Sequence, residues 1–386
     1  TLKSSGAVFG EKLGWERANW FAERDEEPHD IYTFGQPNWH GAVAREHKAA
    51  REAAVLFDQT SFAKYILTGP DAEQALQWIA ANRVDKPIGT IIYTQMLNDK
   101  GGIECDLTCV RTKFNEYYIT TGTGYATHDF DWISRNIPSD LNAQLINVTS
   151  SNAVLSLFGP KAREILQVVT INDVSDNGHP FGLARQISIA GCPVLALRIT
   201  YVGELGWELH LPVEYAQTVY DTLIEAGSPL GLRNAGYRAI ETLRLEKGYR
   251  AWSSDIGPDH TPDEAGLGWA VKMKSNISFK GRDAIARQRE EGIKKIMATF
   301  TTDSDIILSG RETIYRNGHR CGWLSSAGFG HTIGKFIGMG YVRSDEYIDT
   351  EYVLSGEYEL EVATERVKAN VFLKPLYDPK MEKIKT

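Results

Sequence analysis

The chain has 386 residues, of which 42% are hydrophobic and 24% are charged. This length exceeds what one compact core usually serves, so two or three domains are expected. The formal net charge of −8 argues against a nucleic-acid partner, because phosphate binding needs a basic surface. No apolar run approaches the length of a membrane span. We therefore expect neither nucleic acid nor a membrane as a partner, although a small basic pocket is compatible with this charge.

The cysteines indicate a reducing compartment. Cys105, Cys109, Cys192 and Cys321 are scattered and form no CxxC pair. Such spacing suits neither a disulfide scaffold nor a zinc site. We expect a cytoplasmic location, or the mitochondrial matrix in a eukaryote. The start does not resemble a signal peptide, and residue 1 is Thr, so we expect a chain that was processed or cut from a longer one.

The N-terminal part gives few periodic signals. Residues 1–40 are rich in aromatic side chains, and we expect a segment that wraps the surface and is anchored by its rings. Residues 41–56 have apolar residues near helical spacing and are predicted to form a helix.

An α+β module follows. The pattern predicts strands at 63–68, 90–97, 103–111, 116–121 and 143–148, and helices at 69–81 and 125–136. Residues 98–102 (NDKGG) have the glycines of a hairpin turn. This order resembles a ferredoxin-like plait with one added hairpin.

The start of this module recurs about ninety residues later. Leu67, Gly69, Pro70, Ala72, Leu76, Gln77, Asn82 and Val84 match Leu157, Gly159, Pro160, Ala162, Leu166, Gln167, Asn172 and Val174 at a constant offset. We interpret this as a duplicated plait module, with the second copy at 153–226, rather than a coincidence of common strand–helix patterns. Sites tend to form where two such modules meet.

The sequence pattern changes in the rest of the chain. A helix is predicted at 234–248, followed by a loop at 252–268 that is rich in Asp, Pro and Gly. Short strands are predicted at 296–300, 312–315, 321–325, 334–341, 352–354, 360–363 and 368–372. They indicate a small all-β domain, a barrel or a sandwich, that begins near residues 280–292.

The return strand of the first hairpin carries two neighbouring carboxylates. Side chains alternate faces along a strand, so odd positions 103–109 should be buried, with Glu104 and Asp106 on the other face. These two acids form either a solvated face, which position alone favours, or the lining of a pocket.

Other acidic residues leave similar alternatives open. Glu204 lies in a turn between Gly203 and Gly206, where it either meets water or accepts two N–H bonds from a planar heterocycle. Glu241 follows Arg238 by three residues and either pairs with it on the helix surface or leaves it free. The acidic loop at 255–264 fits no metal-binding pattern, so no metal is expected.

Nucleotide-binding motifs are missing from the sequence. Gly122-x-Gly124 and Gly338-x-Gly340 lack the third glycine of a dinucleotide fingerprint, and no P-loop or GxSxG is present. We expect no flavin, NAD or ATP site within this chain.

Six motifs occur in order along the chain: FGEKLGWERANWFA at 9–22, YTQMLNDKGGIECDLT at 93–108, YVGELGWE at 201–208, LRLEKGYR at 243–250, TPDEAGLG at 261–268 and GHTIGK at 330–335. With these motifs the chain resembles the aminomethyltransferase family, the T protein of the glycine cleavage system, over almost its full length. It looks most similar to the folate-binding carboxyl-terminal half of dimethylglycine and sarcosine dehydrogenases.

The resemblance implies a three-domain cloverleaf with tetrahydrofolate in a central channel. We expect one α+β domain at 1–60 with 150–250, a second at 61–149 with 251–284, and a β-barrel domain at 285–386. Asp106 matches the acid beside the folate nitrogens and is the expected catalytic residue. The expected folate-binding residues are Tyr93, Tyr201, Glu204, Arg238 and Tyr377.

Two departures from the family pattern concern the donor. The T protein commonly has two adjacent aspartates where this chain has Cys105-Asp106, and Asp-x-Ser-His-Met where this chain reads DQTSF at 58–62. Recognition of a lipoyl-protein donor is therefore in doubt.

The resemblance implies a tetrahydrofolate-dependent one-carbon transferase. The expected donor is a small N-methyl amine such as dimethylglycine or sarcosine, or its iminium. Since no flavin site is expected here, the chain would receive an activated donor from a flavoprotein partner, demethylate the donor directly, or be a fragment of a larger flavoenzyme. The alternatives are an S- or O-demethylase that passes methyl to tetrahydrofolate, and a folate-binding module without catalysis.

Overall fold

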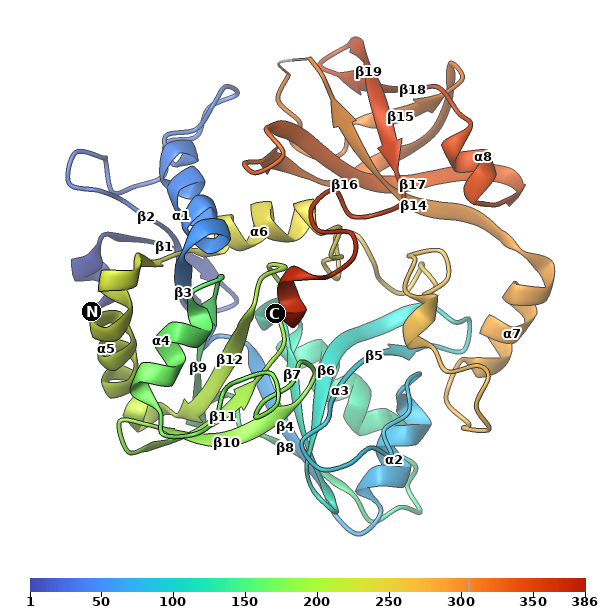
Figure 1. Cartoon of the computed structure of the whole chain (residues 1–386). Helices are drawn as coiled ribbons and strands as arrows, with labels where there is room; N and C mark the ends of the chain where they lie inside the picture. Colours follow the sequence, from blue (N-terminus) through green and yellow to red (C-terminus); the bar gives the residue numbers. More distant parts are fainter. Residues whose placement is uncertain (305) are drawn as a thin grey trace.

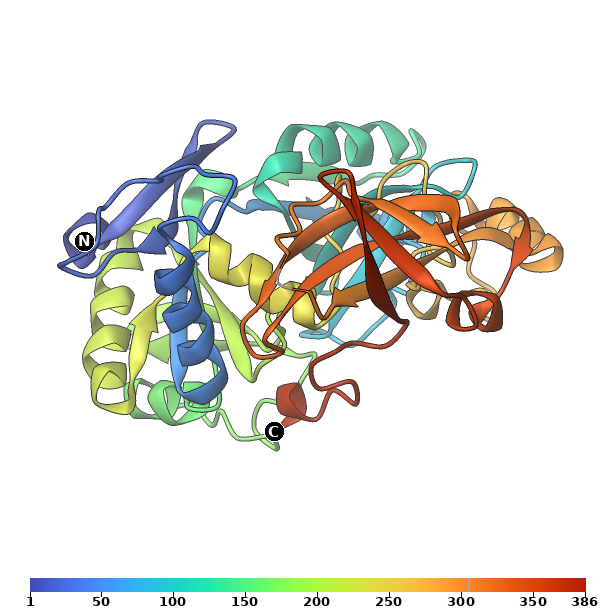
Figure 2. The same ribbon diagram turned by 90° about the horizontal axis from the view of Figure 1, so that it is seen from above.

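The computed structural model describes residues 1–304 and 306–386 and contains two sheets flanked by helices and a closed β-barrel. Figures 1 and 2 show the barrel beside the two α+β parts, with helix α6 (Tyr237–Glu246) running between the first α+β part and the barrel. The predicted α+β class with a C-terminal barrel is confirmed.

The first sheet has the strand order β10-β11-β12-β9-β3-β13. Helices α4 and α5 cover one face, while α1, α6 and the hairpin β1–β2 pack on the other. The bounds are β1 Ala7–Lys12, β2 Trp15–Phe21, α1 His40–Glu52, β3 Ala54–Asp58, β9 Asn152–Phe158, α4 Ala162–Val169, β10 Ala184–Ile189, β11 Cys192–Leu197, β12 Gly206–Pro212, α5 Ala216–Gly227 and β13 Leu232–Asn234.

The second sheet has the order β5-β6-β7-β4-β8. Helices α2 and α3 bury one face, and apolar residues from the loop after α6 and from α7 pack at the edge near Leu97 and Ile103. The bounds are β4 Ala63–Thr68, α2 Ala72–Ile79, β5 Ile91–Leu97, β6 Ile103–Lys113, β7 Glu116–Thr121, α3 Ala126–Asn136 and β8 Gln144–Asn147.

Helix α7 (Arg282–Glu291) leads into the barrel, whose strands close in the order β14-β17-β16-β15-β18-β19. Closure pairs β14 with β19, so the barrel encloses its own apolar core, centred on Phe300, Leu324 and Leu360. The bounds are β14 Ile293–Thr302, β15 Thr313–Arg316, β16 His319–Gly330, β17 Lys335–Ile348, α8 Thr350–Leu354, β18 Tyr358–Val362 and β19 Glu365–Phe372.

The sequence repeat corresponds to a repeated structure. Gly69 and Gly159 both adopt a positive φ, 133° and 131°, at the turn into α2 and α4, and a Cβ at either position would collide with neighbouring backbone. Gln77 donates to the carbonyls of Ala80 and Asn82 and accepts from the amide of Val84. In the second copy Gln167 makes the same three bonds with Thr170, Asn172 and Val174. Each glutamine therefore fixes the loop after its helix.

Several predicted elements are wrong. Residues 352–354 belong to helix α8, because the Asp349 side chain accepts a hydrogen bond from the amide of Tyr352 and caps the helix. The helix predicted at 41–56 ends at Glu52, since Val55 and its neighbours pair with β9 and β13. The N-terminal segment contains the hairpin β1–β2, in which Trp20 is fully buried.

The two sheets and the barrel are built from different stretches of the chain. Strands of the first sheet fall within 54–58 and 152–234, strands of the second within 63–147, and those of the barrel within 293–372. The chain thus leaves the first sheet after β3, builds the second, and returns at β9. We retain these domain bounds as a proposal.

The duplicated glutamines provide a paired test of this account. We expect Gln77→Ala and Gln167→Ala each to lower the free energy of unfolding by ~1–3 kcal/mol, because three backbone groups lose a partner in each variant. Urea denaturation followed by circular dichroism measures this loss. The control Gln74→Ala changes an exposed side chain on the same helix as Gln77 and should stay within about 0.5 kcal/mol of the parent. Equal stabilities for all three variants would refute the role of the glutamines.

Candidate functional site

Asp106 lies in the middle of β6, directly opposite Gln95 on β5. Gln95 Nε2 donates to Asp106 Oδ1 at 2.7 Å. The predicted alternation is confirmed, because Ile103, Cys105, Leu107 and Cys109 are all buried. Asp106 is only partly exposed and has protein groups close around it. Of the two alternatives for this face, the structure favours a lined site over a solvated surface.

The surroundings of Asp106 set its acidity. The pKa of its carboxyl is raised to about 6, mainly by burial and also by the charge of Asp129. Hydrogen bonds from Tyr93 and Gln95 and the charge of Arg250 act in the opposite direction and lower this pKa. Tyr93 extends from the same face of β5 as Gln95, and its ring stacks on Trp269 with centroids 5.7 Å apart. Asp106 can therefore exchange a proton near neutral pH.

Asp129 is a second buried acid near Asp106, on α3. Its carboxylate accepts hydrogen bonds from Thr121 Oγ1 at 2.5 Å and contacts His128 Nδ1 at 2.9 Å. The ligand atoms of Cys105, His128 and Asp129 lie within 4.8 Å of one another. Hydrogen bonds already account for this arrangement, because Asp129 accepts from all three neighbours. Asp129 thus contributes negative charge that raises the pKa of Asp106.

Tyr201 and Arg250 also lie near Asp106. The Tyr201 hydroxyl donates to the carbonyl of Arg250 at 2.9 Å, and the Tyr201 ring stacks on Tyr249 with centroids 5.9 Å apart. Burial raises the pKa of Tyr201 far above its usual range, and Asp106 is one of the charges that act on it. Tyr201 therefore belongs to the surroundings of Asp106 and remains a neutral hydrogen-bonding group.

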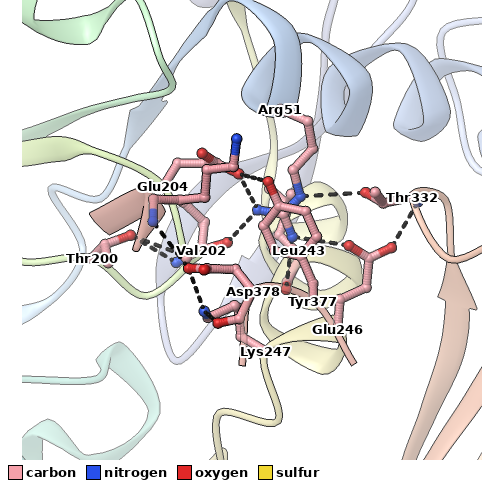
Figure 3. A network of polar contacts seen from close by, with 12 residues as sticks. Arg51, Thr200, Val202, Glu204, Leu243, Glu246, Lys247, Thr332, Tyr377 and Asp378 are labelled. Carbon is pink, nitrogen blue, oxygen red and sulfur yellow. Dashed lines mark hydrogen bonds and ion pairs between the residues drawn. The ribbon is translucent and has the colours of Figure 1, made fainter. Parts of the chain in front are cut away.

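Glu204 follows a tight turn at Gly203, where φ is 82° and a Cβ would strike the Lys247 side chain. Its residue is 2% exposed, so a solvated turn, one alternative from the sequence, is wrong. Arg51 Nη1 and the Tyr377 hydroxyl donate to Glu204 Oε1 at 2.9 and 2.7 Å. Figure 3 shows Arg51, Glu204 and Tyr377 together, with Arg51 over the Tyr377 ring at 3.8 Å.

Arg51 connects Glu204 to a second acid, Glu246 on α6. Arg51 Nη2 donates to Glu246 Oε2 at 2.9 Å, and Glu246 Oε1 accepts from the amide of Thr332 at 2.7 Å (Figure 3). Burial raises the pKa of Glu204 despite Arg51. For Glu246 the effect of burial is outweighed by His47 and Arg51, which lower its pKa to about 2. The shared guanidinium keeps two buried carboxylates in place.

Arg238 lies apart from the hydrogen-bond networks of Asp106 and Glu204. Its guanidinium pairs with Asp30 at 2.6 Å and covers the Trp39 ring at 3.6 Å. Glu241 pairs with Arg244 instead, so the alternative that Glu241 pairs with Arg238 is wrong. A role for Arg238 in folate binding remains a proposal, without a contact that joins it to the other predicted residues in the described chain.

Sequence reasoning missed Arg51, Gln95, Arg250 and Trp269. Gln95 and Arg250 fall inside motifs that were recognised, and the alternation of β5 could have identified Gln95, since it is two residues from Tyr93. Arg51 gave no signal, because its partners Glu204 and Glu246 are distant in sequence.

The comparisons with known proteins agree on one family. Residues 1–275 match the GCVT N-terminal domain, and residues 295–378 match the glycine cleavage T-protein C-terminal barrel domain. Aminomethyltransferase from Halothermothrix orenii is 35% identical over 82% of this chain and 88% of its own. The glycine cleavage aminomethyltransferase structure from Bartonella henselae has a TM-score of 0.82 at 24% identity, and the match covers 98% of this chain and 96% of that one.

Some longer relatives match this chain over only part of their own length. Mitochondrial sarcosine dehydrogenase from Mus musculus is 36% identical over 100% of this chain and 46% of its own. Mitochondrial dimethylglycine dehydrogenase from Homo sapiens is 32% identical over 88% of this chain and 39% of its own. The chain thus spans about half the length of the first of these relatives. Among the described residues, helices are too short or too polar to cross a membrane.

The shared role of Arg51 can be tested by its removal. We expect Arg51→Met to lower the free energy of unfolding by about 3–5 kcal/mol, because Glu204 and Glu246 would be left buried with less compensation. Thermal and urea denaturation measure the loss. Lys48→Met is the matched control on the same helix, since Lys48 pairs with Glu52 at an exposed site and should contribute less than about 1 kcal/mol. If both variants are equally stable, Arg51 does not stabilise the fold through Glu204 and Glu246.

Proposed function

Because the chain belongs to the aminomethyltransferase family of glycine cleavage T proteins, we propose that it transfers a one-carbon unit from a small methylated donor to tetrahydrofolate. The observation that carries this proposal is the Asp106 carboxyl, partly exposed, with a pKa raised to about 6 by burial. Such an acid can accept and return protons at the pH of the cell. Sequence relatives that are named aminomethyltransferase support the assignment.

The residues around Asp106 fit a reduced pterin. A pterin is flat and has several N–H donors, so it needs aromatic surfaces and hydrogen-bond acceptors. Tyr93 with Trp269, and Tyr201 with Tyr249, supply stacked rings. Gln95 is fully buried, and its Oε1 has no hydrogen-bond partner in the described chain. A ligand N–H would satisfy this oxygen.

We propose that Glu204 and Tyr377 hold the pterin while Asp106 carries the chemistry. Arg51 and Tyr377 fix Glu204 through one carboxylate oxygen, Oε1, which leaves Oε2 for a ligand. Tetrahydrofolate supplies weakly basic amines that take up the carbon. The Asp106 carboxylate would orient the amine, accept its proton and stabilise positive charge during transfer. Gln95 would hold Asp106 in position throughout.

We propose an N-methyl amine as the donor, such as sarcosine or dimethylglycine, or its iminium. The names of the longer relatives, sarcosine dehydrogenase and dimethylglycine dehydrogenase, support this class. A flavoprotein partner, or a further part of the same protein, would oxidise the amine before transfer. The mitochondrial relatives also support a matrix location if the source is eukaryotic. An S- or O-demethylase and a folate-binding module without catalysis are the alternatives.

Replacement of Asp106 distinguishes a transferase from a binding module. We expect Asp106→Asn to lower the transfer rate by roughly 10²–10⁴ with little change in tetrahydrofolate affinity, since the amide keeps the shape but cannot accept the proton. Single-turnover kinetics with a chemically generated iminium donor measure the rate. The parent rate should rise with pH through about 6, where Asp106 loses its proton, and the variant should lose this dependence. Unchanged turnover would remove Asp106 from the mechanism.

Replacement of Glu204 tests the binding role separately. We expect Glu204→Gln to weaken tetrahydrofolate binding about tenfold or more, because a charge-assisted hydrogen bond to the pterin is replaced by a neutral one. Fluorescence titration under anaerobic conditions measures the affinity. Glu208→Gln is the control, because Glu208 contacts His210 away from Arg51 and Tyr377. Equal affinity of the Glu204 variant and the parent would exclude Glu204 from the pterin site.

A further inference from the structure

Arg250 is a cation held rigidly beside the candidate site. Its Nε donates to the carbonyl of Ala265 at 2.8 Å and its Nη1 to the carbonyl of Gly248 at 2.5 Å. Gly266, with φ of 69°, leaves room for the guanidinium, since a Cβ there would lie 2.8 Å from Arg250 Nη2. The backbone therefore fixes the orientation of the guanidinium plane.

The charge of Arg250 is not neutralised by a direct ion pair within the described residues. Asp255, one of the two nearby acids, is bound by Arg244, Ser325 and Ser326. Asp106, the other, is held by Gln95. The pKa of Arg250 is lowered because burial outweighs the opposing effects of Tyr93, Tyr341, Asp255 and Asp106. A partly buried guanidinium without a carboxylate partner favours binding of an anion.

Arg250 is also close to residues of the candidate site. Its carbonyl accepts the Tyr201 hydroxyl at 2.9 Å, and its charge acts on both Asp106 and Tyr93. An anion bound by Arg250 would therefore lie near the acid that handles the proton. A guanidinium suits a carboxylate particularly well, because its planar N–H groups match the two oxygens.

We propose that Arg250 binds the carboxylate of the donor and so selects N-methyl amino acids over simple methylamines. This inference rests on the proposed function and adds a recognition residue to it. In such a donor the carboxylate is one carbon from the nitrogen, so a cation near Asp106 can hold the donor while its methyl-derived carbon faces the folate amine. Tetrahydrofolate also has carboxylates, but they lie at the end of the molecule remote from its reacting amines.

The test compares a donor that has a carboxylate with two relatives that lack it. The probes are N,N-dimethylglycine, its methyl ester and dimethylamine, with binding measured by calorimetry and saturation-transfer NMR in the presence of tetrahydrofolate. We expect Arg250→Gln to weaken dimethylglycine binding at least about tenfold, as for loss of a charge-assisted hydrogen bond. The affinities for dimethylamine and tetrahydrofolate should change by less than about twofold. Arg250→Lys should retain part of the dimethylglycine affinity, since it keeps the charge but loses the fork.

Two controls keep the outcomes distinct. Arg83→Gln alters an exposed arginine that pairs with Asp85 and should leave all affinities unchanged. In the unaltered protein, dimethylglycine should bind more tightly than its methyl ester. This comparison does not depend on whether a variant folds. Equal binding of acid and ester, or a loss of tetrahydrofolate affinity in place of donor affinity in Arg250→Gln, would overturn the proposal. Failure of the parent to bind tetrahydrofolate would instead refute the proposed function.

Discussion

The buried charges at the C-terminal end of α6 join the separate parts of the molecule. Arg244 bonds to Asp255, in the loop that covers the second sheet, and to Ser326 on the barrel strand β16. Glu246 accepts from Arg51 on α1 and from the amide of Thr332 after β16. Because such charges are stable inside a protein only when their partners stay in place, this single turn constrains the positions of both sheets and the barrel.

That constraint explains how residues from distant elements can form one site. Lys247, the next residue along, donates to Asp378 and so holds the C-terminal segment that carries Tyr377 against Glu204. Tyr201, on the loop that also bears Glu204, reaches the backbone of Arg250 just beyond α6. Glu204, Tyr201 and Tyr377 therefore share the supports that hold the domains together, which favours a preorganised arrangement of these residues over one assembled by domain closure.

Local sequence patterns predicted most helices and strands, whereas the surroundings of the candidate site residues depend on contacts between residues far apart in the sequence. The repeated Gly-Pro turns located α2 and α4, and strand alternation identified the buried face of β6 and the separate face of Asp106. The helix α8 was missed because one capping bond from Asp349 outweighed the strand propensity of Tyr352 and Val353. The environment of Glu204 could not be predicted, since Arg51 and Tyr377 lie 153 and 173 residues away. Arg238 was expected from the family resemblance, but its ion pair depends on the irregular segment around Asp30.

The two copies of the repeat keep the same scaffold yet have ceased to be equivalent. Both retain the glutamine that fixes the loop after the first helix. The first copy contributes Asp106 from a strand, and the second contributes Glu204 from the turn before β12. Under the proposed function the two copies would therefore contribute different groups, and damage to one copy would not be compensated by the other.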